Sequence, residues 1–535
     1  MMNTFRLLSF LLGAAMFVGC KQQAPTPHLG KIEFHPTGAE AAQPAFQRGL
    51  LLLHSFEYDD AAEAFREARQ IDPDFAMAYW GEAMCSHHPL WRYQDQEKAK
   101  EILAQLGDTP EARQAKAGTE LERDLLQAAE VLFGEGTKPE RDQAYADLLG
   151  RLYEKYPGNN EVAAFYALSL LGSVPVGRDE QVYGKGAQIA QGILASNPRH
   201  PGALHYLIHS YDDPGHAAQA LEAANSYSKV APDAAHALHM PSHIYVALGM
   251  WNEVVNSNIA SYQASVSRME RMKLDNDARS YHALHWLLYG HLQKGQFDEA
   301  AVILREMIQY TDELPSKSAR AYLRSMQGNF LVETGDWTGE FVRIPIDEDD
   351  LNISVRAIGQ YVAGKWAFEN GEPDSLQQII EQMEEARHEA ERVVGESGVP
   401  MCNSSGWTSN VPNRLDIDQA QVMELELRGL HAWFTGDPAA AEQRLREATE
   451  LEASISYSYG PPPVVQPSFE LYGQWLLANE RYEEALAQFD TALARGPRRV
   501  AALQGKLRAA EALGRTEAIE SLQSELADIR EQTGI

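Results

Sequence analysis

A chain of 535 residues is too long to form one compact core, so several domains or one extended repeat array are expected. Its hydrophobic fraction of 44% and its charged fraction of 23% are those of a globular protein. The formal charge of −30 at pH 7 argues against nucleic acid as a partner, because a nucleic-acid-binding protein needs a basic face.

The first residues are predicted to be a targeting segment. A positively charged start is followed at residues 7–17 by an apolar run that is too short for a permanent membrane helix. The run ends in FVGC, which resembles the lipobox of bacterial lipoproteins. The resemblance implies that residues 1–19 are removed, that Cys20 is lipidated, and that lipid alone anchors the chain to the cell envelope. Lys21 favours the outer membrane, and an ordinary secretory signal is the alternative.

Residues 20–40 are rich in proline and polar residues and are predicted to be a tether between the lipid and the fold. After Cys20 the chain has only Cys85 and Cys402, so no disulfide framework is expected in this exported protein. The sequence leaves open whether these two cysteines pair.

From residue 41 the hydrophobic pattern predicts amphipathic helices of about 12–16 residues joined by short turns. Small residues recur where two helices of a hairpin would cross, a large apolar residue recurs at their seam, and proline ends the second helix. The matching sets are Gly49, Ala61, Phe65, Ala68 and Pro73; Gly473, Ala485, Phe489, Ala492 and Pro497; and, with leucine at the seam, Gly429, Ala441, Leu445 and Ala448.

These spacings resemble the tetratricopeptide repeat, and the chain as a whole resembles a bacterial tetratricopeptide-repeat lipoprotein. The resemblance implies an all-α solenoid of helical hairpins that winds into a right-handed superhelix, with partly degenerate repeats between the clear ones. The expected divisions are an N-terminal and central solenoid at 41–394, an irregular loop at 395–415, and C-terminal repeats with a capping helix at 416–535.

Three segments depart from the regular pattern. The polar residues 92–107 are expected to replace the second helix of the second repeat, and the segment 453–467 with the sequence SYSYGPPP is a second irregular loop. Pro241 predicts either a kinked helix from Ala235 to Leu248 or a fresh helix start at the proline. Irregular segments inside a repeat array are often functional.

Histidine is concentrated in one part of the chain. Ten of the 17 histidines lie between His200 and His291, where an even spread would place about three. In tetratricopeptide repeats, positions 2, 5, 9, 12 and 13 of the first helix face the concave groove and contact ligands. When the repeats are numbered from their prolines, a stripe of residues falls at or beside these groove positions: Trp80, His87, His88, His205, His209, Asp212, His236, His239, His243, His282, His285 and Tyr289.

The first interpretation of this stripe is a membrane-anchored scaffold that binds a protein or peptide in its histidine-lined groove. Trp407 and the SYSYGPPP loop are candidates for closing that groove. Asp213 and His216 are expected to have structural roles, and His200 and His291 are expected to lie outside the site.

The alternative interpretation is a transition-metal site for zinc, copper or iron. Imidazoles four residues apart on one helix meet those of the neighbouring helix within reach of one ion. The predicted ligands are His205, His209, His239 and His243, with Asp212 as a further ligand or an orienting partner. His285 is expected to join His239 or to form a second site with His282. No HExxH, GxSxG or GxGxxG motif supports a known catalytic class, and no catalytic residue is assigned.

Overall fold

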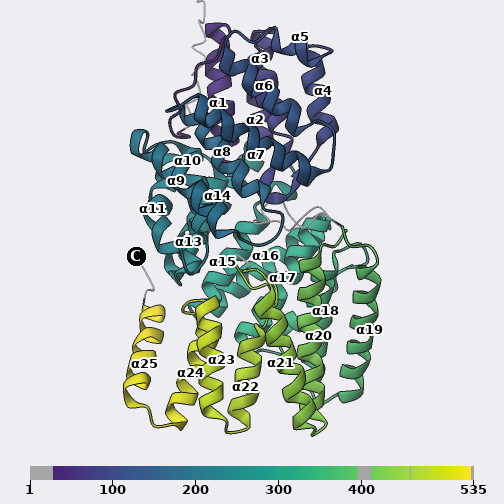
Figure 1. Ribbon diagram of the computed structural model, residues 1–535. Helices are drawn as coiled ribbons and strands as arrows, with labels where there is room; N and C mark the ends of the chain where they lie inside the picture. The colour runs from purple at the N-terminus through teal and green to yellow at the C-terminus, as the bar shows by residue number, and fades with distance from the viewer. Residues whose placement is uncertain (1–27, 396–410, 458–459, 532–535) are drawn as a thin grey trace, which may run out of the picture.

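The computed structural model describes residues 28–395, 411–457 and 460–531. Helices that follow one another in the chain pack as antiparallel hairpins, and the hairpins stack into two lobes (Figure 1). Apart from one two-stranded ladder, β1 (His87–His88) with β2 (Tyr93–Gln94), the described residues form helices and loops. Among the described residues, no helix is long and apolar enough to cross a membrane.

The first lobe, drawn in purple to teal in Figure 1, runs from α1 to α14. Its α-helices are α1 (Gln43–His54), α2 (Tyr58–Ile71), α3 (Ala76–Met84), α4 (Gln96–Leu106), α5 (Pro110–Gln114), α6 (Glu120–Leu132), α7 (Lys138–Lys155), α8 (Asn160–Ser173), α9 (Glu180–Ser196), α10 (Pro201–Tyr211), α11 (Leu221–Val230), α12 (Ala235–His239), α13 (Pro241–Ala247) and α14 (Trp251–Met272). Short 3-10 turns lie at Glu40–Ala42, Pro89–Trp91, Ala217–Ala220 and, after α14, at Asn276–Ala278.

The second lobe, drawn in teal to yellow, continues the stack from α15 to α25. Its α-helices are α15 (Tyr281–Gln293), α16 (Phe297–Glu313), α17 (Lys317–Thr334), α18 (Ile353–Glu369), α19 (Pro373–Glu391), α20 (Arg414–Phe434), α21 (Pro438–Ser454), α22 (Ser468–Ala478), α23 (Tyr482–Arg495), α24 (Val500–Ala512) and α25 (Thr516–Glu531), with a 3-10 turn at Glu340–Val342.

The seams of the hairpins have the geometry that the repeat frame predicts. A Cβ atom on Gly49 would lie 2.9 Å from the Phe65 ring, and one on Gly473 would lie 2.7 Å from the Phe489 ring. Both rings are fully buried. The glycines therefore let two helix backbones approach across an aromatic ring, and the prediction of a tetratricopeptide-type helical-hairpin solenoid is confirmed.

Two local expectations are wrong. The polar segment at 92–107 contains a regular helix, α4, which Asp95 caps by accepting a hydrogen bond from Lys98 N. The last part of the expected tether, residues 28–38, packs on the fold because its apolar residues alternate in an extended chain. Leu29, Ile32 and Phe34 are buried, and Lys31 N donates to Arg199 O at 2.9 Å.

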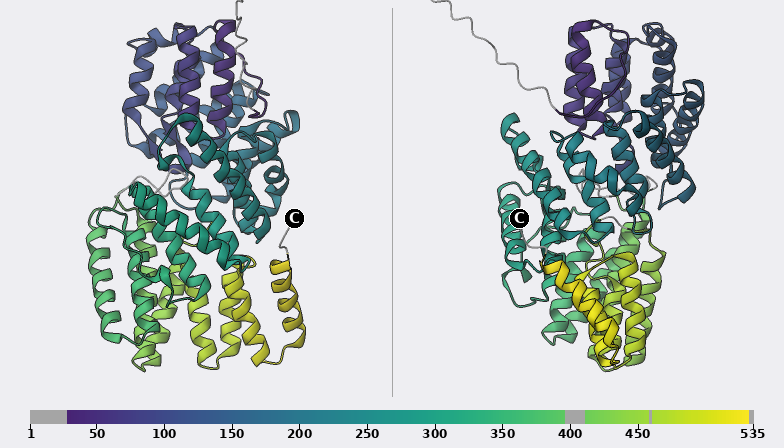
Figure 2. Two further views of the ribbon diagram at one scale, coloured as in Figure 1. Left: turned by 180° about the vertical axis from the view of Figure 1, so that it is seen from behind. Right: turned by 90° about the vertical axis from the view of Figure 1, so that its left-hand side faces the viewer.

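The end of the array folds back onto its middle. The turn between α23 and α24 lies against α14 and α15, where Trp251 Nε1 donates to Arg498 O at 3.1 Å and Val500 N donates to Gln293 Oε1 at 3.0 Å. Figure 2 shows the yellow C-terminal helices below the teal segment in both of its views. The start of the array also contacts its middle: α1 packs on α10, so the first hairpin covers part of the central helices.

Replacing Phe489 with alanine tests the seam. Phe489 is fully buried between two glycine-bearing helices, so Phe489→Ala should lower the free energy of unfolding by about 3–5 kcal/mol. Urea denaturation followed by circular dichroism measures this loss. The matched control is Phe297→Ala, because the Phe297 side chain is 42% exposed. Equal losses in the two variants would contradict the assignment of Phe489 to the seam.

Candidate metal centre

Six histidines from four helices of the array lie close together. His205 and His209 come from α10, His236 and His239 from α12, His243 from α13, and His282 from α15. Two of these helices have strong start signals. His200 caps α10 by accepting from Ala203 N, with Pro201 at the first helical position, and Ser280 caps α15 by accepting from Ala283 N.

The proline within this region begins a new helix. α12 ends at His239 and α13 begins at Pro241, with Met240 between them in helical geometry at φ −52° and ψ −37°. Of the two predicted outcomes, the fresh start is the one found. Because the backbone stays near-helical through Met240, His239 and His243 remain on one face, and their ring centroids are 5.1 Å apart.

The first histidine trio consists of His205, His209 and His236. One ring nitrogen from each lies within 4.8 Å of the other two. The Nε2 atoms of His205 and His236 are 3.2 Å apart. His205 Nδ1 lies 2.8 Å from the backbone carbonyl oxygen of His54 in α1. A carbonyl oxygen can only accept, so His205 carries its proton on Nδ1 and directs a lone pair from Nε2 toward the trio.

The second trio consists of His239, His243 and His282, whose ligand atoms also lie within 4.8 Å of one another. His239 Nε2 is 3.2 Å from His243 Nε2 and 3.0 Å from His282 Nε2. His239 Nδ1 lies 2.7 Å from Asn258 Oδ1, and Asn258 Nδ2 donates to Val254 O, which fixes the amide orientation. His239 therefore donates from Nδ1 and also has its lone pair on Nε2.

Asp212 joins the two trios. Its Oδ2 lies 3.2 Å from His209 Nδ1 and 3.3 Å from His243 Nδ1. The side chain is fully buried. Burial acts to raise the pKa of Asp212, but the hydrogen bonds from the two imidazoles outweigh it and hold the pKa below its usual range. The carboxylate is therefore ionised, and with the imidazole protons on the Nδ1 atoms that face it, His209 and His243 present lone pairs on Nε2.

Two neutral imidazoles consequently face each other without a proton between them. His239 Nδ1 donates to Asn258 Oδ1, and His243 Nδ1 lies 3.3 Å from the Asp212 carboxylate; with the proton of each ring on Nδ1, both Nε2 atoms are acceptors, although they are only 3.2 Å apart. Burial is the main cause that lowers the pKa of His239 well below its ordinary value, so a shared proton is disfavoured at neutral pH. Among the described residues, His209 Nε2 and Asp212 Oδ1 are also buried without a hydrogen-bond partner.

The predicted groove residues do not face an open groove. His205, His209 and Asp212 are fully buried, and His282 and His285 are 8% exposed. The Phe56 ring, after α1, covers the first trio with its centroid 4.3 Å from that of His205. This covering comes from distant parts of the chain, so a repeat frame that describes one hairpin at a time cannot show it.

On the second trio, the cover is Trp286 and the loop before α22. The Trp286 ring centroid lies 4.8 Å from that of His239 and 4.7 Å from that of His243. A Cβ atom on Gly460 would collide with the Trp286 indole. The described part of the irregular loop at 453–467 thus lies over this trio, whereas Trp407 lies outside the described residues.

Several predicted site residues lie outside the trios. Trp80 packs edge-on against Phe165, and His87 lies between aromatic rings with its pKa lowered well below the ordinary value, mainly by burial. His88 stacks on a tyrosine, and burial lowers its pKa to about 4. His285 Nε2 is 2.7 Å from an asparagine oxygen, and the Tyr289 hydroxyl is bonded to Arg499.

The structure places two of the four predicted metal ligands in each trio and adds one histidine to each, and it also brings the predicted ligands His209, Asp212 and His243 within 4.8 Å of one another. His205 and His209 lie with His236, and His239 and His243 lie with His282. His282 thus lies beside His239, whereas His285 does not. Both added residues are on the sequence stripe, at position 2 of their repeats, so the signal for them was present.

A third group, His54, Glu161 and His200, has its hydrogen bonds satisfied. The two Glu161 oxygens lie 2.7 Å from His54 Nε2 and 3.2 Å from His200 Nε2. His54 Nδ1 is 2.9 Å from the Tyr206 hydroxyl, and His200 Nδ1 accepts from Ala203 N. Every ring nitrogen in this group has a partner, so it connects α1, α8 and α10 structurally. His216 and Asp213 also pair with each other, at 2.9 Å.

No protein-family model and no curated protein matches the chain. Solved structures that it resembles include the APC/C hetero-tetramer Cut9–Hcn1, with 13% identity, 90% of this chain and 78% of that chain covered, and a TM-score of 0.34. Yeast Tom70 has 10% identity, 89% of each chain covered and a TM-score of 0.33. A Rap protein complexed with competence and sporulation factor has 12% identity, 78% and 98% covered and a TM-score of 0.35.

At these identities and scores, none of the solved structures transfers a function to this chain. The helical hairpins and their seams define the chain as a helical-repeat protein of the tetratricopeptide type.

Glu161→Gln tests the structural role of the third group. The substituted amide would place an NH₂ group against one imidazole N–H, so the variant should lose about 1.5–3 kcal/mol of unfolding free energy. Urea denaturation measures this loss. Glu180→Gln, on an exposed carboxylate at the start of α9, is the matched control. A Glu161→Gln protein as stable as the control would show that the carboxylate does not hold the three helices together.

Proposed function

We propose that this chain is a transition-metal protein whose buried centre binds two ions, each through three imidazoles. The observation that carries the proposal is the His239–His243 pair, in which two Nε2 lone pairs face each other at 3.2 Å. Two acceptors at this distance repel each other unless a cation lies between them. A metal ion supplies that cation without protonating either ring.

The spacing supports a metal ion. Zinc–imidazole bonds are about 2.0–2.1 Å long, so two nitrogen ligands at a tetrahedral angle lie about 3.3 Å apart. The Nε2 distances of 3.0 and 3.2 Å within the trios are close to this value. The Nδ1 partners of His205, His209, His239 and His243 are the oxygens that orient metal-bound imidazoles in proteins.

The ligand chemistry favours copper or zinc. Imidazole suits these ions and also iron and nickel, whereas magnesium and calcium need oxygen ligands. Three protein ligands for each ion leave a coordination position open, as in catalytic rather than structural zinc sites. Asp212 is the nearby charge that would partly compensate the ions, and its Oδ1 atom is an additional candidate ligand.

The other function expected from the sequence is a protein or peptide bound in a histidine-lined groove. It requires these side chains at the surface, and their burial is therefore the observation that favours the metal.

Metal analysis of protein purified without a polyhistidine tag tests the proposal. After loading with copper or zinc and removal of excess metal, mass spectrometry of the elements should find two equivalents per chain. His239→Ala should lower the content by at least one equivalent. Asp212→Asn should weaken metal affinity roughly 10- to 100-fold, because the two orienting acceptor bonds are disturbed.

His285→Ala is the matched control, since His285 is buried in the same helix as His282 but its Nε2 bonds to Asn329. This variant should keep both equivalents. Metal content at the buffer blank for copper, zinc, iron, nickel, manganese and cobalt, before and after loading, would contradict the proposal.

The location is proposed separately, from the FVGC sequence at residues 17–20. We propose that a lipid on Cys20 anchors the chain to the bacterial cell envelope, with the outer membrane favoured. Cys20→Ser should shift the protein from the membrane fraction to the soluble exported fraction in cell fractionation. A substitution of Cys85 should leave the fractionation unchanged. A Cys20→Ser protein that stays in the membrane fraction would exclude the lipid anchor.

A further inference from the structure

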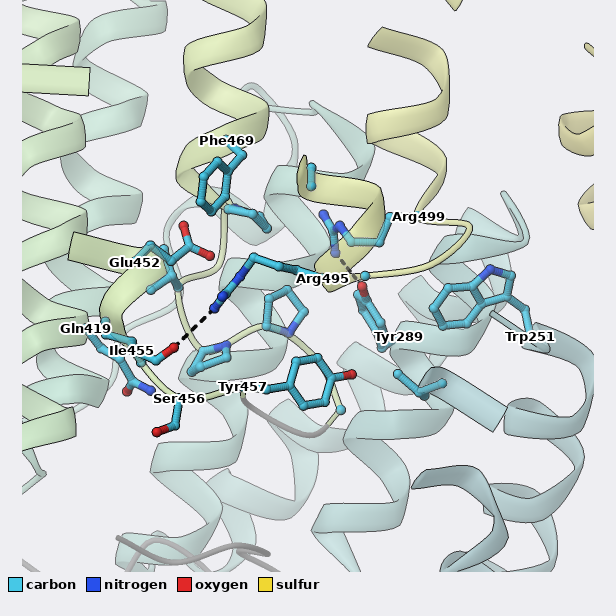
Figure 3. Close-up of a pocket in the computed structure, with 18 residues that line it drawn as sticks. Trp251, Tyr289, Gln419, Glu452, Ile455, Ser456, Tyr457, Phe469, Arg495 and Arg499 are labelled. Atoms are coloured by element: carbon cyan, nitrogen blue, oxygen red, sulfur yellow. Dashed lines mark hydrogen bonds between the residues drawn. The ribbon is translucent and has the colours of Figure 1, made fainter. Parts of the chain in front are cut away.

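A second feature of the structure lies next to Gly460, the loop residue that contacts Trp286. A cavity of ≈ 80 Å³ opens where the end of the array folds back onto its middle (Figure 3). One water molecule needs about 10–15 Å³ by the same measure, so the cavity has room for a ligand of several heavy atoms. Its walls come from α13, α14 and α15, from α20 to α23, from the loop before α22 and from the α23–α24 turn, and most of the wall is apolar.

The cavity has one polar end. In Figure 3, Arg495 extends into the cavity toward Ile455, and Glu452 and Gln419 lie on the same side. Tyr457, Tyr289 and Trp251 lie on the other side of the picture. A ligand that fits this arrangement carries its charges at one end and an apolar body at the other.

Arg495 is the cationic group with unused donors. Its guanidinium makes one long hydrogen bond, 3.5 Å to Ile455 O, and lies 5.9 Å from the centroid of the Phe469 ring. No carboxylate within the described parts of the chain forms an ion pair with it. The neighbouring Arg499 differs, because Glu470 at 2.6 Å and Glu333 at 2.8 Å occupy its donors. Arg495 therefore has donors to offer to an anionic group.

Glu452 is the matching acidic group. Its Oε2 accepts from Ser468 N at 2.7 Å and from the Ser468 hydroxyl. Among the described residues, Oε1 has no such partner and remains for a ligand. Burial raises the pKa of Glu452, although the bonds from Ser468 oppose the rise. A cationic group in the cavity would stabilise the ionised carboxylate.

We propose that this cavity binds a small aliphatic α-amino acid. Its carboxylate would pair with Arg495, its ammonium group would pair with Glu452, and its side chain would lie against the walls formed by Val246, Val464 and the prolines of the loop. A zwitterion satisfies both charged groups at once, whereas a simple acid or amine would satisfy only one of them. Leucine is of suitable size, and the small volume excludes long or branched peptides.

This site is independent of the proposed metal centre. Among the described residues, neither Trp286 nor any histidine lines the cavity, and Gly460 is the lining residue that contacts Trp286. Binding is therefore expected both in metal-loaded protein and in protein treated with a chelator, so failure of one proposal does not imply failure of the other.

Isothermal titration calorimetry with L-leucine on the full mature chain tests the site. Saturable binding of one equivalent is expected. N-acetyl-leucine and leucinamide, which each lack one charge, should bind on the order of tenfold more weakly or worse. Arg495→Gln and Glu452→Gln should each lower the affinity for L-leucine by a similar factor.

Arg508→Gln, an exposed arginine in α24, is the matched control and should bind as the parent protein does. Helicity by circular dichroism shows whether each variant is folded, and Arg495→Lys provides a second variant that keeps the charge and should retain part of the affinity. No binding of leucine, isoleucine or valine at about 10 mM would overturn the proposal. Equal affinity for N-acetyl-leucine, or unchanged affinity in a folded Arg495→Gln protein, would overturn the zwitterion site.

Discussion

The candidate centre depends on one buried carboxylate. Asp212 follows α10; its Oδ2 accepts a hydrogen bond from His209, in its own repeat, and lies 3.3 Å from His243 Nδ1, in the next one. An ionised group in the interior is costly unless charged or polar partners compensate it. The two imidazole N–H groups provide that compensation, and in doing so they fix both rings with their lone pairs turned inward. Asp212 thus determines where α10 and α13 must lie and which atoms face the centre.

The hydrogen-bond partners of the ring nitrogens distinguish the trios from the other buried histidines. In the group around Glu161, each imidazole nitrogen has a donor or an acceptor of the correct kind, and the group is complete as a structural network. In the trios, the outer nitrogens of four rings lie 2.7–3.3 Å from oxygen acceptors and the inner nitrogens face one another. Histidine content alone does not separate these cases, but the direction of each hydrogen bond does.

Much of the fold could be predicted from the sequence, because the contacts within a tetratricopeptide-type hairpin join residues that lie close in the sequence. Gly49 and Phe65 lie close in sequence, and their packing follows from spacing alone. The stripe of histidines could be predicted for the same reason. Their surroundings could not, because Phe56 and the carbonyl of His54 come from a hairpin some 150 residues away from His205. The helix at α4 was missed because its surface is polar, and its Asp95 cap was the overlooked signal.

Gly460 connects the two proposed sites physically. Its φ of +97° lies in the region that favours glycine and would be strained for most other residues, and a side chain at this position would collide with Trp286. Both requirements hold the loop before α22 against the indole whose other contacts are His239 and His243. The loop in turn supplies Ile455 and the prolines that bound the cavity. Gly460 lines the cavity and also contacts the indole that packs on the histidines, so the loop before α22 links the two proposed sites.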